Sequence, residues 1–318
     1  MAGEFDLIDR IAARIVARDD VVLGIGDDAA VLRPPIGHQL VVAMDTLNSG
    51  VHFPPETAPA DIGWKALAVN LSDLAAMGAV PAWCTLSLSL PDPDAAWVDA
   101  FLDGFDALAG AHGIALVGGD TTRGPLSVCV TVFGFVAPGA ALRRDAARAG
   151  DDLWVSGTPG DAAAALAQWS RGEVCDPALR SRLDRPTPRV TLGRGLSGLA
   201  HSAIDVSDGL LADLGHICRA SGVAAEVDVD ALPVSAALRA AGLDAATRRA
   251  LQAGGGDDYE LCFTAPASTR LAIAAAAAAA ATPVARIGRI AEGAGITTIT
   301  ADGGAWRPAR VGWDHFPG

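Results

Sequence analysis

Paired aspartates that follow glycines recur along the chain, and such residues could hold a divalent metal ion. The first of these segments is Gly24-Ile25-Gly26-Asp27-Asp28. Glycine lets the backbone approach a ligand closely, and neighbouring carboxylates repel each other unless a cation lies between them. Carboxylate oxygens suit a hard ion such as Mg²⁺. An aspartate in such a loop can also simply cap the next element, and for a single segment the two interpretations are equally good.

The recurrence of these signals favours the metal interpretation. Further acidic segments are Met44-Asp45-Thr46, Ser72-Asp73-Leu74, Gly118-Gly119-Asp120-Thr121, Asp205-Val206-Ser207-Asp208-Gly209 and Gly255-Gly256-Asp257-Asp258. A helix is expected to begin after Gly209, with Ser207 as its N-cap. The positive end of that helix would favour a phosphate or a metal-bound phosphate between Asp205 and Asp208.

Composition and charge exclude several classes of protein. A chain of 318 residues with 51% apolar and 19% charged residues is globular and long enough for two domains. The net charge of −13 disfavours nucleic acid and anionic membranes as partners. The longest apolar run, Leu271 to Ala281, is too short to cross a bilayer, which needs roughly 20 residues. The acidic N-terminus does not resemble a signal peptide, so we expect a cytoplasmic protein.

Cysteine and lysine usage exclude further classes. The five cysteines are scattered without a Cys-x-x-Cys pair, which disfavours structural zinc and a disulfide framework. Lys65 is the only lysine, and Trp64 precedes it. A Walker A loop requires Gly-Lys-Ser/Thr, and the protein-kinase lysine has its own flanking motif, so both architectures are excluded. If the protein uses ATP, it must hold the phosphates by other means.

Hydrophobic periodicity predicts an α/β protein with mixed sheets. Helices are expected over 5–18, 59–77, 94–111, 210–220 and around 274–281, and strands over 39–44, 82–90, 114–117, 127–136, 152–156, 203–206, 259–264, 284–290 and 296–300. Asp45 should lie where its strand ends, and residues 118–124 should form a turn. Residues 137–150 have no strong period, which predicts domains over 1–137 and 138–318. Small residues along 61–77, and the strand over 82–90, predict a dimer interface nearby.

Together, these segments resemble the thiamine-phosphate kinases of the aminoimidazole-ribonucleotide-synthetase superfamily. The resemblance is collinear over almost the whole chain. It rests on Gly3-Glu4-Phe5, GIGDDAAV, His52-Phe53, Lys65 to Gly78, GGDTTRGPLS, Gly157-Thr158-Pro159-Gly160-Asp161, Ala203 to Gly209, Asp258-Tyr259-Glu260-Leu261 and Asp314-His315-Phe316. The fold that it implies is the two-domain fold of that superfamily, as a homodimer.

The resemblance also implies a reaction and a set of ligands. The reaction is ATP-dependent phosphorylation of thiamine monophosphate to thiamine diphosphate, with ATP as co-substrate and several Mg²⁺ ions. It implies metal ligation by Asp28, Asp45, Asp73, Asp120, Asp205 and Asp208, ATP contacts from Gly119, Asp120, Arg144 and Ser207, substrate contacts from His52, Asp257 and Trp313, and catalytic roles for Asp45, Asp120, Arg144 and Asp208. A phosphate monoester is mostly ionised at neutral pH, its second pKa being about 6, so its attack on ATP requires no general base.

Two positions depart from the pattern of the family. Ala43 and Met44 stand where family members often carry metal-ligating Ser and Thr, so only backbone carbonyls could serve there, and Asp257 stands where Glu is common. Two other functions would share the fold. An ATP-dependent synthetase of the superfamily would differ at the substrate end, where His52, Asp257 and Trp313 favour thiamine. A non-catalytic nucleotide-binding protein would bind Mg-ATP without turnover.

Overall fold

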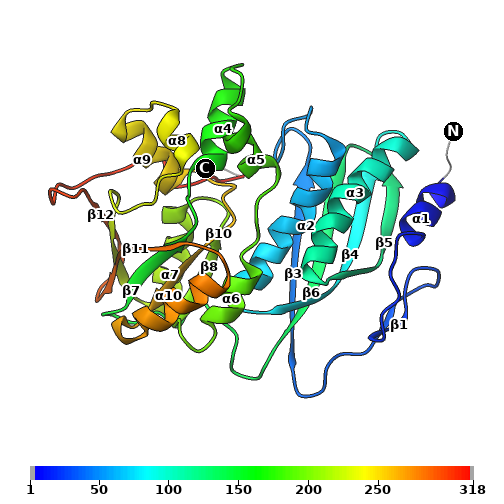
Figure 1. The fold of residues 1–318 in the computed structure, drawn as a ribbon, viewed down its shortest axis with the longest axis horizontal. Coiled ribbons are helices and arrows are strands. Elements are labelled where there is room, and N and C mark those ends of the chain that lie inside the picture. Colours follow the sequence, from blue (N-terminus) through cyan, green and yellow to red (C-terminus); the bar gives the residue numbers. More distant parts are fainter. Residues whose placement is uncertain (1–3, 316–318) are drawn as a thin grey trace. The chain divides into compact units, whose positions relative to one another are not determined.

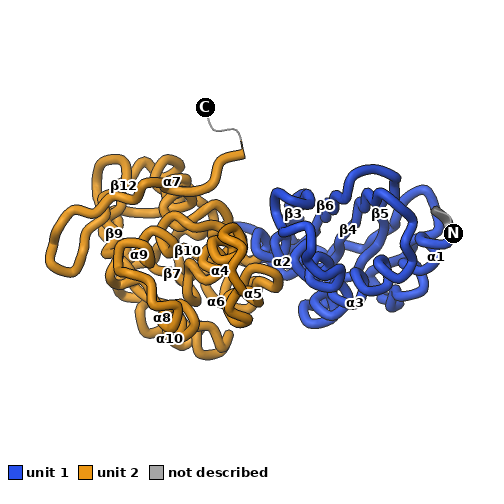
Figure 2. Tube along the Cα trace, turned by 90° about the horizontal axis from the view of Figure 1, so that it is seen from above, with its two compact units in different colours: residues 1–74, 79–139 blue, residues 75–78, 140–318 orange. Residues whose placement is uncertain are grey.

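The structure, a computed structural model, describes residues 4–315. Gly3 and Phe316, which contribute to two of the motifs above, lie outside the described residues. The chain forms two compact units, residues 1–74 with 79–139 and residues 75–78 with 140–318 (Figure 2). Among the described residues, no helix combines the length and hydropathy needed to cross a membrane.

The first unit is built on a four-stranded sheet in the order β3-β6-β4-β5 (Figure 1). The elements of this part of the chain are α1 (Glu4–Ala12), β1 (Val21–Leu23), β2 (Val31–Leu32), β3 (Gln39–Asn48), α2 (Pro59–Ala76), β4 (Val80–Leu90), α3 (Ala95–His112), β5 (Ala115–Arg123) and β6 (Ser127–Val136). Strands β4 and β5 run parallel, whereas β6 is antiparallel to both β3 and β4. The sheet is therefore mixed, as the sequence predicts.

Helices α2 and α3 cover one face of this sheet (Figure 1). The residues that face them, including Leu86 and Val130, are almost completely buried. The two helices approach each other through glycines: a Cβ on Gly63 would lie 2.0 Å from the Phe101 carbonyl oxygen, and one on Gly104 would lie 1.7 Å from the Ala60 carbonyl oxygen. The small residues of α2 thus have a packing role inside the unit.

The other face of the sheet carries exposed apolar side chains on the edge strand β3. Leu40, Val42 and Met44 alternate along this strand, so they share one face. Their side chains are 55%, 52% and 62% exposed. Asp45 has the opposite parity and lies in register with Val130 of β6, so it belongs to the face that the helices cover.

The second unit is built on a six-stranded sheet in the order β12-β9-β11-β7-β10-β8. Its elements are β7 (Asp152–Ser156), α4 (Asp161–Ser170), α5 (Pro177–Asp184), α6 (Val190–Leu196), β8 (Ser202–Val206), α7 (Leu210–Ser221), β9 (Ala224–Asp228), α8 (Ala236–Ala240), α9 (Ala245–Gly254), β10 (Glu260–Ala265), the 3₁₀ turn η1 (Ala267–Thr269), α10 (Arg270–Ala279), β11 (Val284–Ala291) and β12 (Gly295–Ile299). Helix α7 packs on the sheet through Leu210, Leu214 and Ile217, which are completely buried.

Three boundary predictions are wrong. Helix α1 ends at Ala12, not near Arg18. Beyond it, Val16 is 78% exposed, and Arg14 pairs with Asp103 and Asp106 of α3, contacts made outside a helix. Strand β3 does not end at Asp45, because its pairing with β6 continues to Asn48.

The predicted turn at residues 118–124 is part of strand β5, which pairs with β4 as far as Arg123. The glycines have a different role from the predicted one. A Cβ on Gly119 would lie 1.8 Å from the Leu86 carbonyl oxygen, so glycine lets the two strands approach each other. Asp120 consequently lies within an edge strand, not at the tip of a loop.

Candidate active site

The segment between β8 and α7 carries Asp205, Ser207 and Asp208. Asp205 is the penultimate residue of β8 and is 4% exposed, while Ser207 and Asp208 are half-buried. The prediction that Ser207 caps the helix is wrong, since Gly209 occupies the N-cap position and no side chain caps from there. The backbone N–H groups of the segment are satisfied instead by Asp213, from the first turn of α7. Its Oδ2 accepts hydrogen bonds from Ser207, Asp208 and Gly209, each at 3.1 Å.

Two distant parts of the chain attach to the same segment by backbone hydrogen bonds. The Asp257 N–H donates to the Ser207 carbonyl at 2.8 Å, and the Trp313 N–H donates to the Asp208 carbonyl at 2.9 Å. The predicted metal and ATP ligands Ser207 and Asp208 therefore lie beside the predicted substrate ligands Asp257 and Trp313. Residues that are about 50 and 100 positions apart in the sequence thus lie together at one place in the second unit.

The turn that carries Asp257 has an unusual backbone. Asp257 and Tyr259 adopt positive φ angles of 67° and 50°. Residues other than glycine rarely adopt this backbone conformation. The Tyr259 N–H donates to the Val206 carbonyl at 2.8 Å, which holds the turn against β8. The phenol Oη of Tyr259, the only tyrosine in the chain, donates to Asp257 Oδ1 at 3.1 Å. The Asp257 carboxylate is thus oriented by its own turn.

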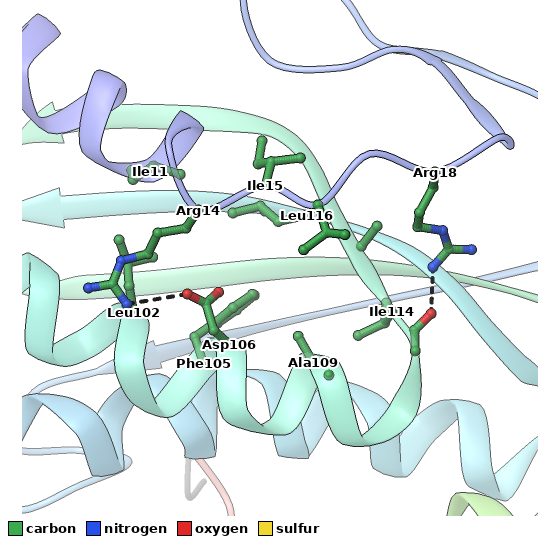
Figure 3. A pocket seen from close by; sticks show the side chains of 14 residues that line it. Ile11, Arg14, Ile15, Arg18, Leu102, Phe105, Asp106, Ala109, Ile114 and Leu116 are labelled. Carbon is green, nitrogen blue, oxygen red and sulfur yellow. Dashed lines mark hydrogen bonds and ion pairs between the residues drawn. The ribbon is translucent and has the colours of Figure 1, made fainter.

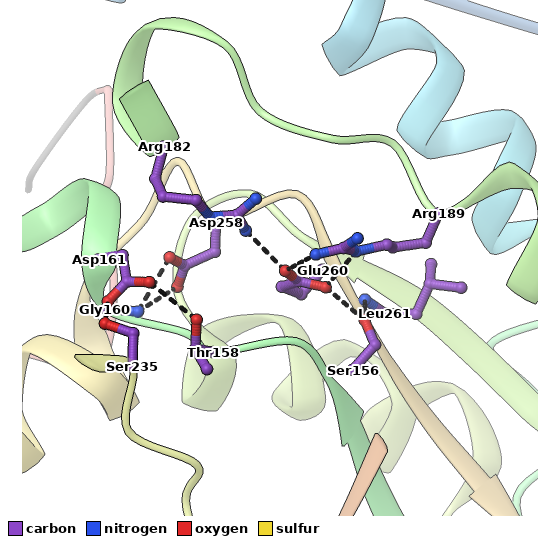
Figure 4. A network of polar contacts seen from close by, with 10 residues as sticks. All are labelled: Ser156, Thr158, Gly160, Asp161, Arg182, Arg189, Ser235, Asp258, Glu260 and Leu261. Atoms are coloured by element: carbon purple, nitrogen blue, oxygen red, sulfur yellow. Dashed lines mark hydrogen bonds and ion pairs between the residues drawn. The ribbon is translucent and has the colours of Figure 1, made fainter. Parts of the chain in front are cut away.

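A buried ionic network holds Asp258 and Glu260, which follow Asp257 in the chain (Figure 4). Glu260 is completely buried and accepts hydrogen bonds from Arg189 and Arg182, at 2.5 to 2.6 Å. Both oxygens of Asp258 accept the Gly160 N–H at 2.9 Å. Burial raises the pKa of Asp258 well above its usual value, with the Gly160 hydrogen bond opposing the shift. The network thus fixes Asp258 and Glu260, the next two acidic residues after Asp257.

A cleft of about 970 Å³ opens beside the segment. Asp208 and Trp313 both line it, and Trp313 is 53% exposed. Arg219 and His216 of α7 also line it, and the Arg219 guanidinium donates to His216 Nδ1 at 3.1 Å. Burial, then the charges of Arg219 and Arg144, lower the pKa of His216. The Arg144 carbonyl accepts a hydrogen bond from Ser221 Oγ at 2.8 Å, at the end of α7. The cleft thus combines an indole wall, a carboxylate and the guanidinium groups of Arg219 and Arg307.

The first unit gathers a second set of predicted residues where β3 meets α2. The Asp45 N–H donates to Asn70 Oδ1 at 2.8 Å, and Asn70 Nδ2 donates to the Ala66 carbonyl. Asp73 lies on α2 three residues beyond Asn70, on the same side of the helix. His52 follows β3, and its Nδ1 accepts the Asn48 N–H at 3.0 Å.

Asp120 and Asp28 are not brought to Asp45 within one chain. Asp120 lies on β5 and Asp45 on β3, the two edge strands of the sheet, which three strand spacings of about 4.8 Å separate. Asp28 is exposed in the loop between β1 and β2. Among the described residues, no group of three or more His, Cys, Asp or Glu side chains is close enough to hold a metal ion.

The first unit also contains a separate cavity of about 330 Å³ (Figure 3). It is lined by residues 11–18 and by residues of α3 and β5, with mainly apolar walls. Its polar groups are engaged: Arg14 pairs with Asp106, and Arg18 donates to the Gly113 carbonyl. None of the predicted site residues is among the residues that line it.

Both halves of the chain match one family of domains. Residues 26–136 match the N-terminal domain of AIR synthase related proteins, and residues 148–300 match the C-terminal domain of these proteins. A thiamine-monophosphate kinase from Salmonella typhimurium is 47% identical over 99% of this chain and 98% of its own length. The chain belongs to the thiamine-monophosphate kinase family. The resemblance and the fold class predicted from the sequence are confirmed.

Solved structures of thiamine-monophosphate kinases agree with this assignment. The enzyme from Stenotrophomonas maltophilia K279a is 60% identical, with a TM-score of 0.88 over 96% of this chain and 98% of its own. AaThiL complexed with AMPPCP and TMP is 33% identical, with a TM-score of 0.78 over 99% of this chain and 97% of its own. The fold of this chain is therefore the fold of thiamine-monophosphate kinases over nearly its full length.

Three residues that support the candidate site were missed by sequence reasoning. Asp213 holds the segment before α7, Asn70 ties the Asp45 backbone to α2, and Tyr259 orients Asp257. Asp213 could have been found from its spacing: an acid four residues after Gly209 lies in the first turn of the helix, where it can accept the free backbone N–H groups. Asn70 and Tyr259 act through contacts that no local spacing reveals.

Proposed function

We propose that this protein phosphorylates thiamine monophosphate to thiamine diphosphate with ATP as the phosphoryl donor. The observation that carries the proposal is the attachment of Asp257 and Trp313 to the segment that bears Ser207 and Asp208. It puts the residues assigned to the acceptor beside those assigned to the nucleotide. Relatives that are 47% and 60% identical over nearly the whole chain are thiamine-monophosphate kinases, which favours this reaction over that of a synthetase of the same superfamily.

The donor set of the site fits Mg²⁺. The proposed ligands, Asp28, Asp45, Asp73, Asp120, Asp205 and Asp208, offer carboxylate oxygens, and Ala43 and Met44 could add backbone carbonyls. The side chains of Ser207 and Asp208 make no hydrogen bond or ion pair with any described residue, while their backbone groups are all engaged. Bound Mg²⁺ would neutralise the charge of the phosphates.

The remaining residues would position the two substrates for direct in-line transfer. Arg144 and the Gly119 backbone would contact the ATP phosphates. The Arg144 carbonyl is held by Ser221 Oγ at the end of α7, the helix whose residues line the cleft together with Asp208. Trp313 would present its indole face to the thiazolium or aminopyrimidine ring, and Asp257 and His52 would accept or donate hydrogen bonds there. Because the acceptor phosphate is already ionised, these side chains need only orient it and exclude water.

We also propose a homodimer in the cytoplasm. In it, the predicted N-terminal domain (1–137) provides the dimer interface and ATP and metal ligands, and the predicted C-terminal domain (138–318) completes the site. The exposed apolar row of Leu40, Val42 and Met44 supports an interface on the open face of the sheet. Asp45 and Asp120 lie on opposite edge strands, so two chains could supply what one does not bring together. Sedimentation that shows a fully active monomer at micromolar concentration would contradict the dimer.

A coupled assay of ADP release tests the proposed reaction. Purified protein should release ADP only when thiamine monophosphate, ATP and Mg²⁺ are all present. Asp45→Asn and Asp120→Asn should each lose most of this turnover while keeping the far-UV spectrum and melting temperature, because both residues are exposed. The hydrogen bond of Asp45 to Asn70 uses the backbone N–H, which Asn retains, and the Asp120 side chain makes no hydrogen bond with any described residue. Binding of Mg-ATP without turnover in the wild type would instead identify a nucleotide-binding protein.

A further inference from the structure

The segment of residues 206–209 has its shape fixed by one buried carboxylate. Three consecutive N–H groups, of Ser207, Asp208 and Gly209, donate to the same oxygen of Asp213. Asp213 is 3% exposed, so these bonds are shielded from water. Such a fan of N–H groups around one oxygen forces the segment to curve around the carboxylate. The side chains of Ser207 and Asp208 take no part in these hydrogen bonds.

The carbonyl groups of the same residues are fixed from the other side. Ser207 accepts from the Asp257 N–H and Asp208 accepts from the Trp313 N–H. Every backbone polar group of these two residues is therefore engaged within the second unit. Their side chains remain for ligands, and Asp208 lines the cleft.

If Asp213 served only to stabilise the start of α7, a carboxylate at this position would be unfavourable. Asp205 and Asp208 both lie close enough for their charges to act on Asp213. Three acids at one place repel each other, and Ser, Thr or Asn would satisfy helix N–H groups without adding a charge. A carboxylate differs from these caps in its negative charge, which strengthens each hydrogen bond that it accepts from an N–H group.

We propose that Asp213 is a positioning residue, which holds Ser207 and Asp208 in the geometry that binds the Mg-nucleotide. The inference rests on the proposed function, since it assumes that Ser207 and Asp208 contact ATP and metal. Residues behind metal ligands typically change metal affinity or activity by about 10-fold to 100-fold when substituted. Asp213 should act in this range, although it lies too deep to touch either substrate.

Asp213→Asn tests the proposal because it keeps the shape of the side chain and removes the charge. Calorimetric titration with a non-hydrolysable ATP analogue at varied Mg²⁺ should show the half-saturating Mg²⁺ concentration raised about tenfold. In the ADP-release assay kcat should fall by about 10-fold to 100-fold, and excess Mg²⁺ should restore part of the loss. The KM for thiamine monophosphate should change less than the Mg²⁺ dependence.

Asp161→Asn is a matched control. Asp161 is also 3% exposed, lies in the first turn of a helix of the same unit, and accepts hydrogen bonds from Thr158 and Ser235. This variant should lose stability but keep the Mg²⁺ dependence of the wild type. If both variants lose stability and neither changes the Mg²⁺ dependence, Asp213 is structural and the inference is wrong.

Asp213→Glu covers the case in which the Asn variant does not fold. It keeps the charge but moves the carboxylate by one methylene, so this variant too should raise the half-saturating Mg²⁺ concentration. If the Glu variant bound the Mg-nucleotide analogue as the wild type does, the inference would be wrong. The two proposals fail separately. A wild type that binds the Mg-nucleotide analogue without phosphorylating thiamine monophosphate would refute the function, while the binding titration would still test Asp213.

Discussion

Removal of one hydroxyl group, in Tyr259→Phe, should separate acceptor binding from nucleotide binding. The Tyr259 phenol donates to Asp257 Oδ1, and the ring is 7% exposed, so Phe fills the same space. The hydrogen bonds that hold the turn use the backbone, and the substitution does not touch them. The change therefore removes one contact that orients the Asp257 carboxylate and leaves the turn in place.

The expected size follows from the strength of that hydrogen bond. Hydrogen bonds to charged groups contribute about 1.5 to 3 kcal/mol. The O···O distance of 3.1 Å is long for a hydroxyl donor, so the lower end applies. About 1.5 kcal/mol corresponds to roughly a tenfold change in an equilibrium constant. We expect the KM for thiamine monophosphate to rise by up to about tenfold, with the KM for ATP changed by less than about twofold.

Steady-state ADP release with each substrate varied in turn measures both constants. Thr158→Val is the matched control, because it removes a hydroxyl that donates to a carboxylate, Asp161, elsewhere in the same unit. The control should leave both KM values unchanged. Equal increases in both KM values for Tyr259→Phe, or no increase in either, would show that Asp257 does not bind the acceptor through this arrangement.

Three further changes test other features. Trp313→Ala should raise the KM for thiamine monophosphate by about threefold to thirtyfold with little change for ATP; equal damage to both, with a lower melting temperature, would make the residue structural. The stability of Asp258→Asn relative to the wild type should increase as pH rises above about 4, the ordinary pKa of an aspartate. The folded-state pKa of Asp258 is raised, so the wild type loses stability as pH rises through that value, whereas Asn does not ionise; a difference in melting temperature that is constant with pH would contradict this. Gly104→Ala should cost about 1 to 3 kcal/mol in urea unfolding, because its Cβ would meet the Ala60 carbonyl, whereas Gly110→Ala in the same helix meets open space and should not destabilise; equal effects would refute the packing argument.

The order of helices and strands could be predicted from the sequence because the hydrophobic patterns that indicate them are local. The alternation over 82–90 and the apolar run over 39–44 both predict strands that the structure contains as β4 and β3. The predicted limits of β3 and β5 were wrong, because the pairing with a neighbouring strand decides where each strand ends. Asp45 lies inside β3 because β6 continues beside it, and Gly119 lies inside β5 because β4 approaches it closely.

The site was predictable in its residue types but not in its supports. Glycine beside aspartate indicates a ligand loop from composition alone, which is why Asp208 and Asp257 could be selected. The contacts that join them are backbone hydrogen bonds, and a backbone donor has no signature in the sequence. Ser207 was predicted to accept the free N–H groups at the start of α7, whereas Asp213 accepts them. Both residue types cap helices, and only the geometry decides between them.

The only lysine of the chain is inside the first unit. Lys65 is 1% exposed, and its Nζ donates to the His52 carbonyl at 2.9 Å, beside the loop that carries a proposed substrate ligand. A reagent specific for amines consequently has a single side-chain target, and it reaches that target only when α2 separates from the loop. One mass increment on the peptide that contains Lys65 would therefore record the opening of this region, at a rate that the folded protein itself sets. Ligands that stabilise the contact between α2 and the His52 loop should slow this labelling. Binding of such ligands could therefore be followed without any measurement of turnover.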